Sequence, residues 1–82
     1  MVILMSPAQF RMARAALRWG LVETAKRANV STSTIVRFER GDVLKSITVN
    51  HLKTILEVAG IEFISEGRGE GVLLRRDEFD QA

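Results

Sequence analysis

The stretch LVETAKRANVSTSTIVRFERG, from Leu21 to Gly41, decides the fold because it predicts two short helices joined by a tight turn. Ala25 is small enough for a second helix to cross close to the first. Asn29 favours the left-handed backbone that ends a helix, and Ser31 can accept hydrogen bonds from the amides that begin the next one. The stretch therefore predicts a helix-turn-helix.

The second helix of this pair is expected over Thr32–Arg40, after a first helix over Leu21–Ala28. Ile35 and Phe38 are three residues apart and share one face, which we expect to lie on the core. Hydroxyl and guanidinium groups dominate the other faces, and Gly41 supplies a left-handed stop. The pair therefore buries an apolar face and leaves a polar helical face open to a partner.

Together with its flanking helices, the region Ala16–Gly60 resembles the phage-repressor and Cro family of helix-turn-helix domains, often called XRE-type. The resemblance is carried by LRWGLVETAKRANVSTSTIVRFERG, in which A-x-x-x-N-V-S is followed by I-x-x-F-E-x-G. It implies a mainly α, four-helix, lambda-repressor-like domain that places its second motif helix in the major groove of double-stranded DNA. The expected function is sequence-specific transcriptional regulation, with repression as the default output for so small a chain.

The matching positions assign DNA contacts to the exposed side of this recognition helix, where arginine is the natural partner of guanine. The residues expected near base edges are Thr32, Ser33, Thr34, Val36 and Arg37, and those expected near phosphates are Lys26, Ser31, Arg40 and Lys45. The methyl groups of Val36 suit contact with a thymine methyl. An ordinary solvated helix face is the alternative for all of these residues.

Three further positions are compared with the family. Its members pair an Arg of the first helix with the Glu of the E-x-G segment, and Arg14 and Glu39 match these positions. We expect a buried or half-buried ion pair that fixes the placement of the helices, because desolvation offsets much of the Coulomb attraction. Leu21 departs from the family, since many members have a phosphate-contacting Gln there. The side-chain contact with a phosphate is therefore in question at this position, although the backbone amides at the start of this helix can still face a phosphate.

Helices are also predicted on either side of the motif. A serine cap followed by proline predicts a first helix over Pro7–Trp19, with Trp19 as a core residue at its end. A fourth helix is expected to begin at a cap formed by Ser46 or Thr48 and to end at Gly60. The domain would therefore have four helices.

Beyond Gly60 the hydrophobic period changes from that of a helix to that of a strand, which predicts a β-hairpin. One strand is expected to begin at Ile61, a glycine-rich turn to span residues 66–71, and the return strand to span residues 72–76. The predicted organisation is an arm (1–5), a helix-turn-helix domain (6–60), a hairpin (61–76) and an acidic tail (77–82).

The predicted hairpin has apolar residues on both faces, and an isolated pair of strands is marginal in water. If Ile61 faces the helices, alternation turns Ile64 outward. We expect the hairpin to build a two-fold homodimer, either by strand pairing or by face packing. The residues assigned to this contact are Ile61, Phe63, Ile64, Val72, Leu73 and Leu74. The alternatives are packing on residues 2–4 of the same chain, and a toxin or other protein partner.

A homodimer is expected to place two recognition helices in successive major grooves, about 34 Å apart on a near-palindromic operator. Two other functions stay open. One is an antitoxin-type autorepressor, whose DNA module is similar and whose extra element covers a toxin. The other is a protein-interaction module, such as an antagonist of another regulator, that binds DNA weakly.

Composition argues against several other classes. The 82 residues leave room for one small domain, without cysteine and with a single histidine, His51, which is expected to be exposed. The start lacks the features of a secretory signal or a membrane span, so we expect a cytoplasmic protein. No enzyme activity, cofactor, metal or small-molecule substrate is expected, because the sequence offers no cluster of catalytic groups.

Charge is divided unevenly along the chain. Residues 6–53 carry nine Lys or Arg and three acids, a net charge of +6, whereas residues 54–82 carry three Arg and seven acids, a net charge of −4. A basic helical part suits a nucleic-acid surface, and an acidic end suits a solvated or protein-facing surface.

Overall fold

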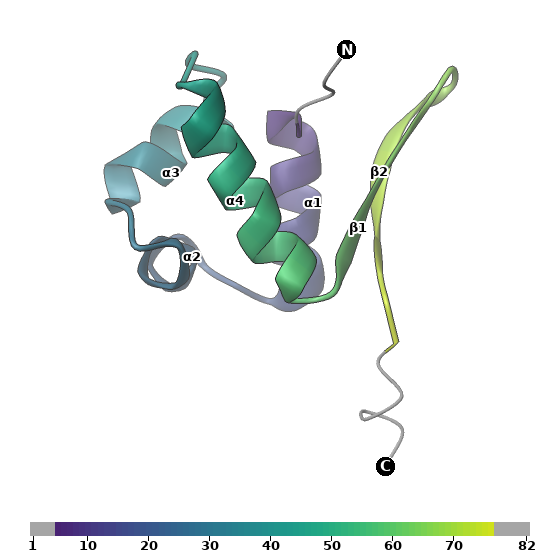
Figure 1. Ribbon diagram of the computed structural model, residues 1–82, viewed down its shortest axis with the longest axis horizontal. Helices are drawn as coiled ribbons and strands as arrows, with labels where there is room; N and C mark the ends of the chain where they lie inside the picture. The colour runs from purple at the N-terminus through teal and green to yellow at the C-terminus, as the bar shows by residue number, and fades with distance from the viewer. Residues whose placement is uncertain (1–4, 77–82) are drawn as a thin grey trace.

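Four helices and a two-stranded antiparallel hairpin form a small, mainly α domain in the computed structural model, which describes residues 5–76 (Figure 1). The elements are α1 (Pro7–Leu17), α2 (Leu21–Ala28), α3 (Thr32–Glu39), α4 (Ser46–Val58), β1 (Ile61–Glu66) and β2 (Gly69–Leu74). The expected acidic tail and residues 1–4 of the expected arm lie outside the described residues. Met5, which was assigned to the arm, is buried in the core.

Helix α1 begins as predicted, with Ser6 and Gln9 forming a capping box. The Ser6 hydroxyl accepts from the Gln9 amide at 3.1 Å, and the Ser6 amide donates to Gln9 Oε1 at 3.0 Å. The prediction for its end was wrong, because α1 stops at Leu17 rather than Trp19. Arg18 adopts a left-handed conformation with φ 61°, which breaks the helix although this residue is not glycine.

The turn between α2 and α3 follows the predicted chemistry. Asn29 is left-handed with φ 56°, and the Val30 amide donates to the carbonyl of Ala25 at 3.0 Å. The Ser31 hydroxyl then caps α3 by accepting from the Thr34 amide at 3.2 Å. Both predicted boundaries of α2 and the predicted start of α3 are confirmed.

Glycines with positive φ follow α3 and α4, and α4 begins without a side-chain cap. Helix α3 ends at Glu39, one residue before the predicted end, and Gly41 follows with φ 97°. Helix α4 begins at Ser46 after Lys45, and no side chain caps it, so the prediction of a hydroxyl cap from Ser46 or Thr48 was wrong. Gly60 has φ 114° and directs the chain from α4 into β1.

Strands β1 and β2 pair in the register Ile61↔Leu74 to Glu66↔Gly69, joined by Gly67 and Arg68 alone. The predicted turn over residues 66–71 and return strand over residues 72–76 were therefore wrong in their bounds. The glycine-rich segment is largely strand.

The core lies between the helices and the hairpin. Its largest fully buried apolar side chains come from α1, α3, α4 and β1 and are Phe10, Ile35, Leu52, Leu56 and Ile61. The rings of Phe10 and Phe38 meet edge to face, with centroids 5.4 Å apart. Figure 1 shows the hairpin beside α1 and α4, while α3 lies at the opposite end of the molecule. Among the described residues, no helix has the length and apolar character needed to cross a membrane.

Candidate nucleic-acid interface

Helix α3 presents a polar face to solvent and an apolar face to the core. Ile35 and Phe38 are buried, whereas the side chains of the opposite faces are open. The exposed members of the predicted base-edge set are Thr32, Ser33, Val36 and Arg37. The structure therefore brings four of the five predicted base-edge residues together on one accessible surface.

The fifth predicted residue, Thr34, takes part in the helix start. Its hydroxyl lies 2.9 Å from the Ser31 hydroxyl, which is also 3.1 Å from that of Ser33 and accepts from the Thr34 amide. Thr34 is only half-buried, but its hydroxyl is already engaged. These hydroxyls order the first turn of α3.

Asp42 binds both arginines of this surface. Arg40 makes two contacts with its carboxylate, Nε to Oδ1 at 3.2 Å and Nη2 to Oδ2 at 2.5 Å. Arg37 Nε lies 3.7 Å from Oδ2. Hydrogen bonding from Arg40 holds the pKa of Asp42 below its ordinary value, and the charge of Arg37 acts in the same direction.

The hydrogen bond between Arg40 and Asp42 also raises the pKa of Arg40, and the charge of the Asp42 carboxylate acts in the same direction. Asp42 was not among the site residues assigned from the sequence. Its position two residues after Arg40 was the available signal. A carboxylate between two guanidinium groups competes with phosphate and base edges for the same donors.

The other predicted phosphate residues flank α3 at its two ends. Lys26 is exposed in the last turn of α2, and Lys45 is exposed immediately before α4. Leu21 is partly buried against the core, which is a packing role. This side chain supplies no polar group to a phosphate.

The end of α3 is fixed to α1 by the expected ion pair of Arg14 and Glu39. Arg14 Nε contacts Glu39 Oε2, and Arg14 Nη2 donates to Oε1 at 2.9 Å, with side chains 18% and 14% exposed. Arg14 Nη1 also donates to the carbonyl of Trp19 at 3.0 Å, and Arg11 Nη1 donates to the carbonyl of Glu39 at 2.8 Å. This bidentate, partly buried arrangement holds α3 in one orientation.

Two aromatic side chains near the helix-turn-helix have structural roles. Trp19 packs against the core, and the guanidinium of Arg27 lies over its ring, 4.4 Å from the centroid. His51 is exposed as predicted, yet its Nε2 lies 2.8 Å from the carbonyl oxygen of Ala28. This contact joins α4 to the end of α2, and sequence reasoning missed it.

The predicted dimer residues divide between two faces of the hairpin. Ile61, Phe63 and Val72 face inward and pack on or in the core, while Ile64 and Leu73 are exposed on the outer face. Leu74 pairs with Ile61 and so shares the inner face, although it is exposed. Gln9, which belongs to the capping box of α1, also donates from Nε2 to carbonyl oxygens of both strands, a contact that sequence reasoning missed. The hairpin is therefore fastened to α1, far from the polar face of α3 (Figure 1).

Neither a scan against protein-family models nor a search of curated proteins found a match to this chain. The exposed face of α3 and the contacts that hold it therefore carry the functional inference.

Proposed function

We propose that this protein is a sequence-reading DNA-binding regulator that presents α3 to the major groove of double-stranded DNA. The observation that carries the proposal is the exposed polar face of α3, held by two helices that are joined through the left-handed Asn29 and the Ser31 cap. In this lambda-repressor-like arrangement, Arg37 is the residue suited to guanine O6 and N7. Thr32 and Ser33 supply hydroxyls beside it, and Val36 suits a thymine methyl.

Phosphate contacts provide most of the affinity in such a complex, and base contacts provide most of the sequence preference. Lys26 and Lys45 extend the basic surface beyond the two ends of α3. Arg40 is a phosphate ligand once it leaves Asp42. The net charge of +6 over residues 6–53 supports this assignment.

Preorganisation supports the same assignment. The ion pair of Arg14 and Glu39 fixes the end of α3, and His51 fixes the end of α2. Recognition helices held in advance lose little conformational freedom on binding. We propose that the protein acts as a homodimer on a near-palindromic operator and represses by occupying it.

The proposal is tested by selecting duplexes from a random pool with the purified chain, then measuring affinities by fluorescence anisotropy across a salt series. We expect the selected duplex to bind with an affinity that falls steeply with salt. Arg37→Ala should lose about 10- to 100-fold of the preference for the selected over a scrambled duplex. Arg76→Ala is the matched control, because it removes the same charge from an exposed position after β2, away from α3. Equal binding of all duplexes by the wild-type chain would contradict the proposal.

One observation favours a second function. Asp42 occupies Arg37 and Arg40, and Leu21 offers no polar side chain at a phosphate position of the family. A protein-interaction module, such as an antagonist of another regulator or an antitoxin, needs no free arginines on this surface. Weak binding to every duplex, together with binding of a protein partner through the hairpin, would favour this reading.

A further inference from the structure

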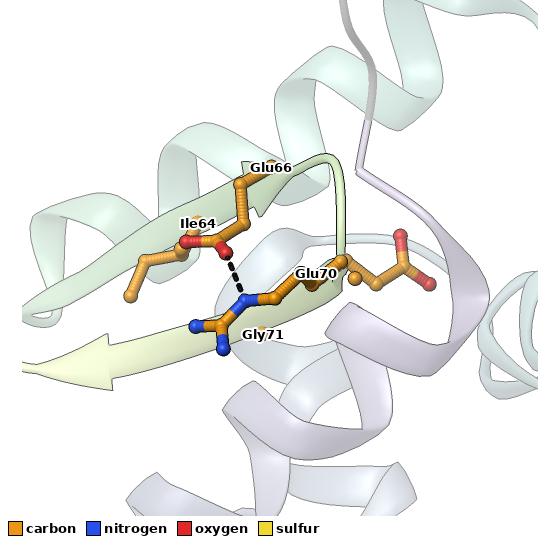
Figure 2. A pocket seen from close by; sticks show the side chains of 6 residues that line it. Ile64, Glu66, Glu70 and Gly71 are labelled. Carbon is orange, nitrogen blue, oxygen red and sulfur yellow. Dashed lines mark hydrogen bonds and ion pairs between the residues drawn. The ribbon is translucent and has the colours of Figure 1, made fainter.

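The outer face of the hairpin, which faces away from the helices, is apolar along part of its length. Ile64 and Leu73 point to this side and are 42% and 46% exposed. The register pairs Ile64 with Gly71, so the side chain of Ile64 stands next to a position without one. In Figure 2, Ile64 and Glu66 point to one side of the hairpin and Glu70 to the other.

The two glycines of this face have no role in folding that the structure shows. Gly69 and Gly71 alternate along β2 and are not left-handed. A Cβ atom at either position would meet nothing within 4 Å. Glycine weakens a strand interior, and it commonly marks a place where another chain or ligand approaches closely.

These glycines leave a shallow hollow of about 310 Å³ beside the ridge formed by Ile64. The hollow is lined by both strands near the turn, including Glu66, Arg68 and the two glycines (Figure 2). Glu66 and Arg68 form an exposed ion pair across it, with Oε1 and Nε 3.0 Å apart. The face thus combines a ridge on β1, a hollow on β2 and both signs of charge.

We infer that this face docks against the same face of a second copy of this chain, with the two-fold axis running along the strands. Rotation about such an axis leaves the height of each residue along the strands unchanged. It sets β1 of one copy against β2 of the other. The register then places Ile64 over the partner's Gly71, and Glu66 over the partner's Gly69. Arg68 lies at the same end and meets the partner's Glu66. The part of the face near the turn is self-complementary in shape and charge, which an isologous contact requires.

The size of the face sets the strength of this contact. Two strands of six residues cover about 20 Å by about 10 Å, or roughly 200 Å² per copy. A standard interface buries about 800 Å² per partner. We therefore expect a weak dimer, with a dissociation constant in the micromolar range, that forms fully when DNA holds two copies together.

Sedimentation velocity of the full chain without DNA, from about 5 to about 500 µM, tests the interface separately from DNA binding. The wild-type chain should shift from monomer to dimer as its concentration rises. Gly71→Ile fills the hollow and should abolish the shift, while the melting temperature stays equal or rises because the added side chain meets open space. Ser65→Val is the control, since it adds a β-branched side chain to the opposite face.

The double variant Ile64→Gly with Gly71→Ile exchanges ridge and hollow, and under the proposed axis it should dimerise again. Recovery of dimerisation in the double variant would favour packing of the two outer faces over pairing of strands at the hairpin edge. A wild-type chain that stays monomeric at about 500 µM would overturn the inference and indicate that residues 2–4 or a different protein cover the face. A dimer that Gly71→Ile leaves intact would also overturn it. Either result leaves the DNA-binding proposal standing.

Discussion

Replacing Gln9 by methionine tests how strongly one buried side chain holds the hairpin on the helices. Nε2 of Gln9 donates to the carbonyl oxygens of Ile64 and Gly71 at 3.0 and 3.1 Å, and Oε1 accepts from the Ser6 amide at 3.0 Å. Gln9 is only 3% exposed. Methionine keeps the length of the side chain and loses the donor and the acceptor, so packing changes little.

Each of these three hydrogen bonds contributes about 1 kcal/mol to the free energy of unfolding, so Gln9→Met should lower it by about 3 kcal/mol. A domain of this length has a total stability of roughly 4–12 kcal/mol. The loss is therefore a large fraction of the total. The melting temperature should fall by about 12–24 °C.

Urea unfolding gives the measurement, followed by circular dichroism and by the fluorescence of Trp19, the single tryptophan. Ser6→Ala is the comparison for the cap alone and should cost about 1 kcal/mol. Gln9→Glu should be more damaging at neutral pH, because a carboxylate would face two carbonyl oxygens. Burial raises the pKa of that new carboxyl in the folded chain. The loss in the free energy of unfolding caused by Gln9→Glu should therefore shrink as the pH falls toward the pKa of this carboxyl in the unfolded chain. A loss below about 0.5 kcal/mol in Gln9→Met would refute the reasoning.

Three further predictions concern the ion pairs and one turn. Arg14→Ala and Glu39→Ala should each cost about 3 kcal/mol in urea unfolding, because each leaves a partly buried charge unpaired. The variant that carries both substitutions should lose less unfolding free energy than the sum of the two single losses. Additive losses would contradict the coupling between Arg14 and Glu39. Asp42→Asn should tighten DNA binding and steepen its salt dependence by up to about one charge, since Arg40 is released to phosphate. The pKa of Asp42 lies below its ordinary value, so Asp42 stays ionised and paired with Arg40 at neutral pH. The difference in DNA affinity between Asp42→Asn and the wild type, measured by anisotropy, should therefore be constant between about pH 5 and 8. Unchanged DNA binding by Asp42→Asn would contradict the idea that Asp42 competes with phosphate for Arg40. Gly60→Ala should lower the free energy of unfolding by about 1–2 kcal/mol in thermal melts, since φ is 114° there, and no loss would contradict the strain.

The helix-turn-helix could be predicted because its rules are local. Asn29 ends α2 and Ser31 starts α3 through the backbone and side-chain chemistry of a few neighbouring residues. The stop at Gly41 follows from the same kind of reasoning. The face of α3 that meets solvent also followed from the three-residue spacing of its apolar side chains.

The boundaries that were missed depend on choices that the local sequence leaves open. Arg18 takes a left-handed conformation that few non-glycine residues adopt, so nothing marked the end of α1. Gly69 and Gly71 favoured a long turn, yet pairing with β1 made them strand. For α4, the nearby hydroxyl residues suggested a side-chain cap that the helix does not use.

The contacts that complete the candidate site were missed because they join distant segments. Gln9 meets β1 and β2 more than fifty residues later in the chain, and His51 meets the end of α2. Hydrophobic periodicity carries no information about such polar pairs. The bond between Arg40 and Asp42 is local, and the spacing of two residues was a usable signal.

The placement of α3 and the hairpin at opposite ends of the molecule bears on the layout of an operator. The longest dimension is 39 Å, and these two elements mark its ends (Figure 1). Recognition of adjacent major grooves, about 34 Å apart, would require each α3 to lie within about 17 Å of the dimer axis. An axis beyond the outer face of the hairpin exceeds that limit and favours a separation near two turns, about 68 Å. The operator would then contain a central turn of DNA that neither copy reads, where bending stiffness rather than base identity would set the affinity.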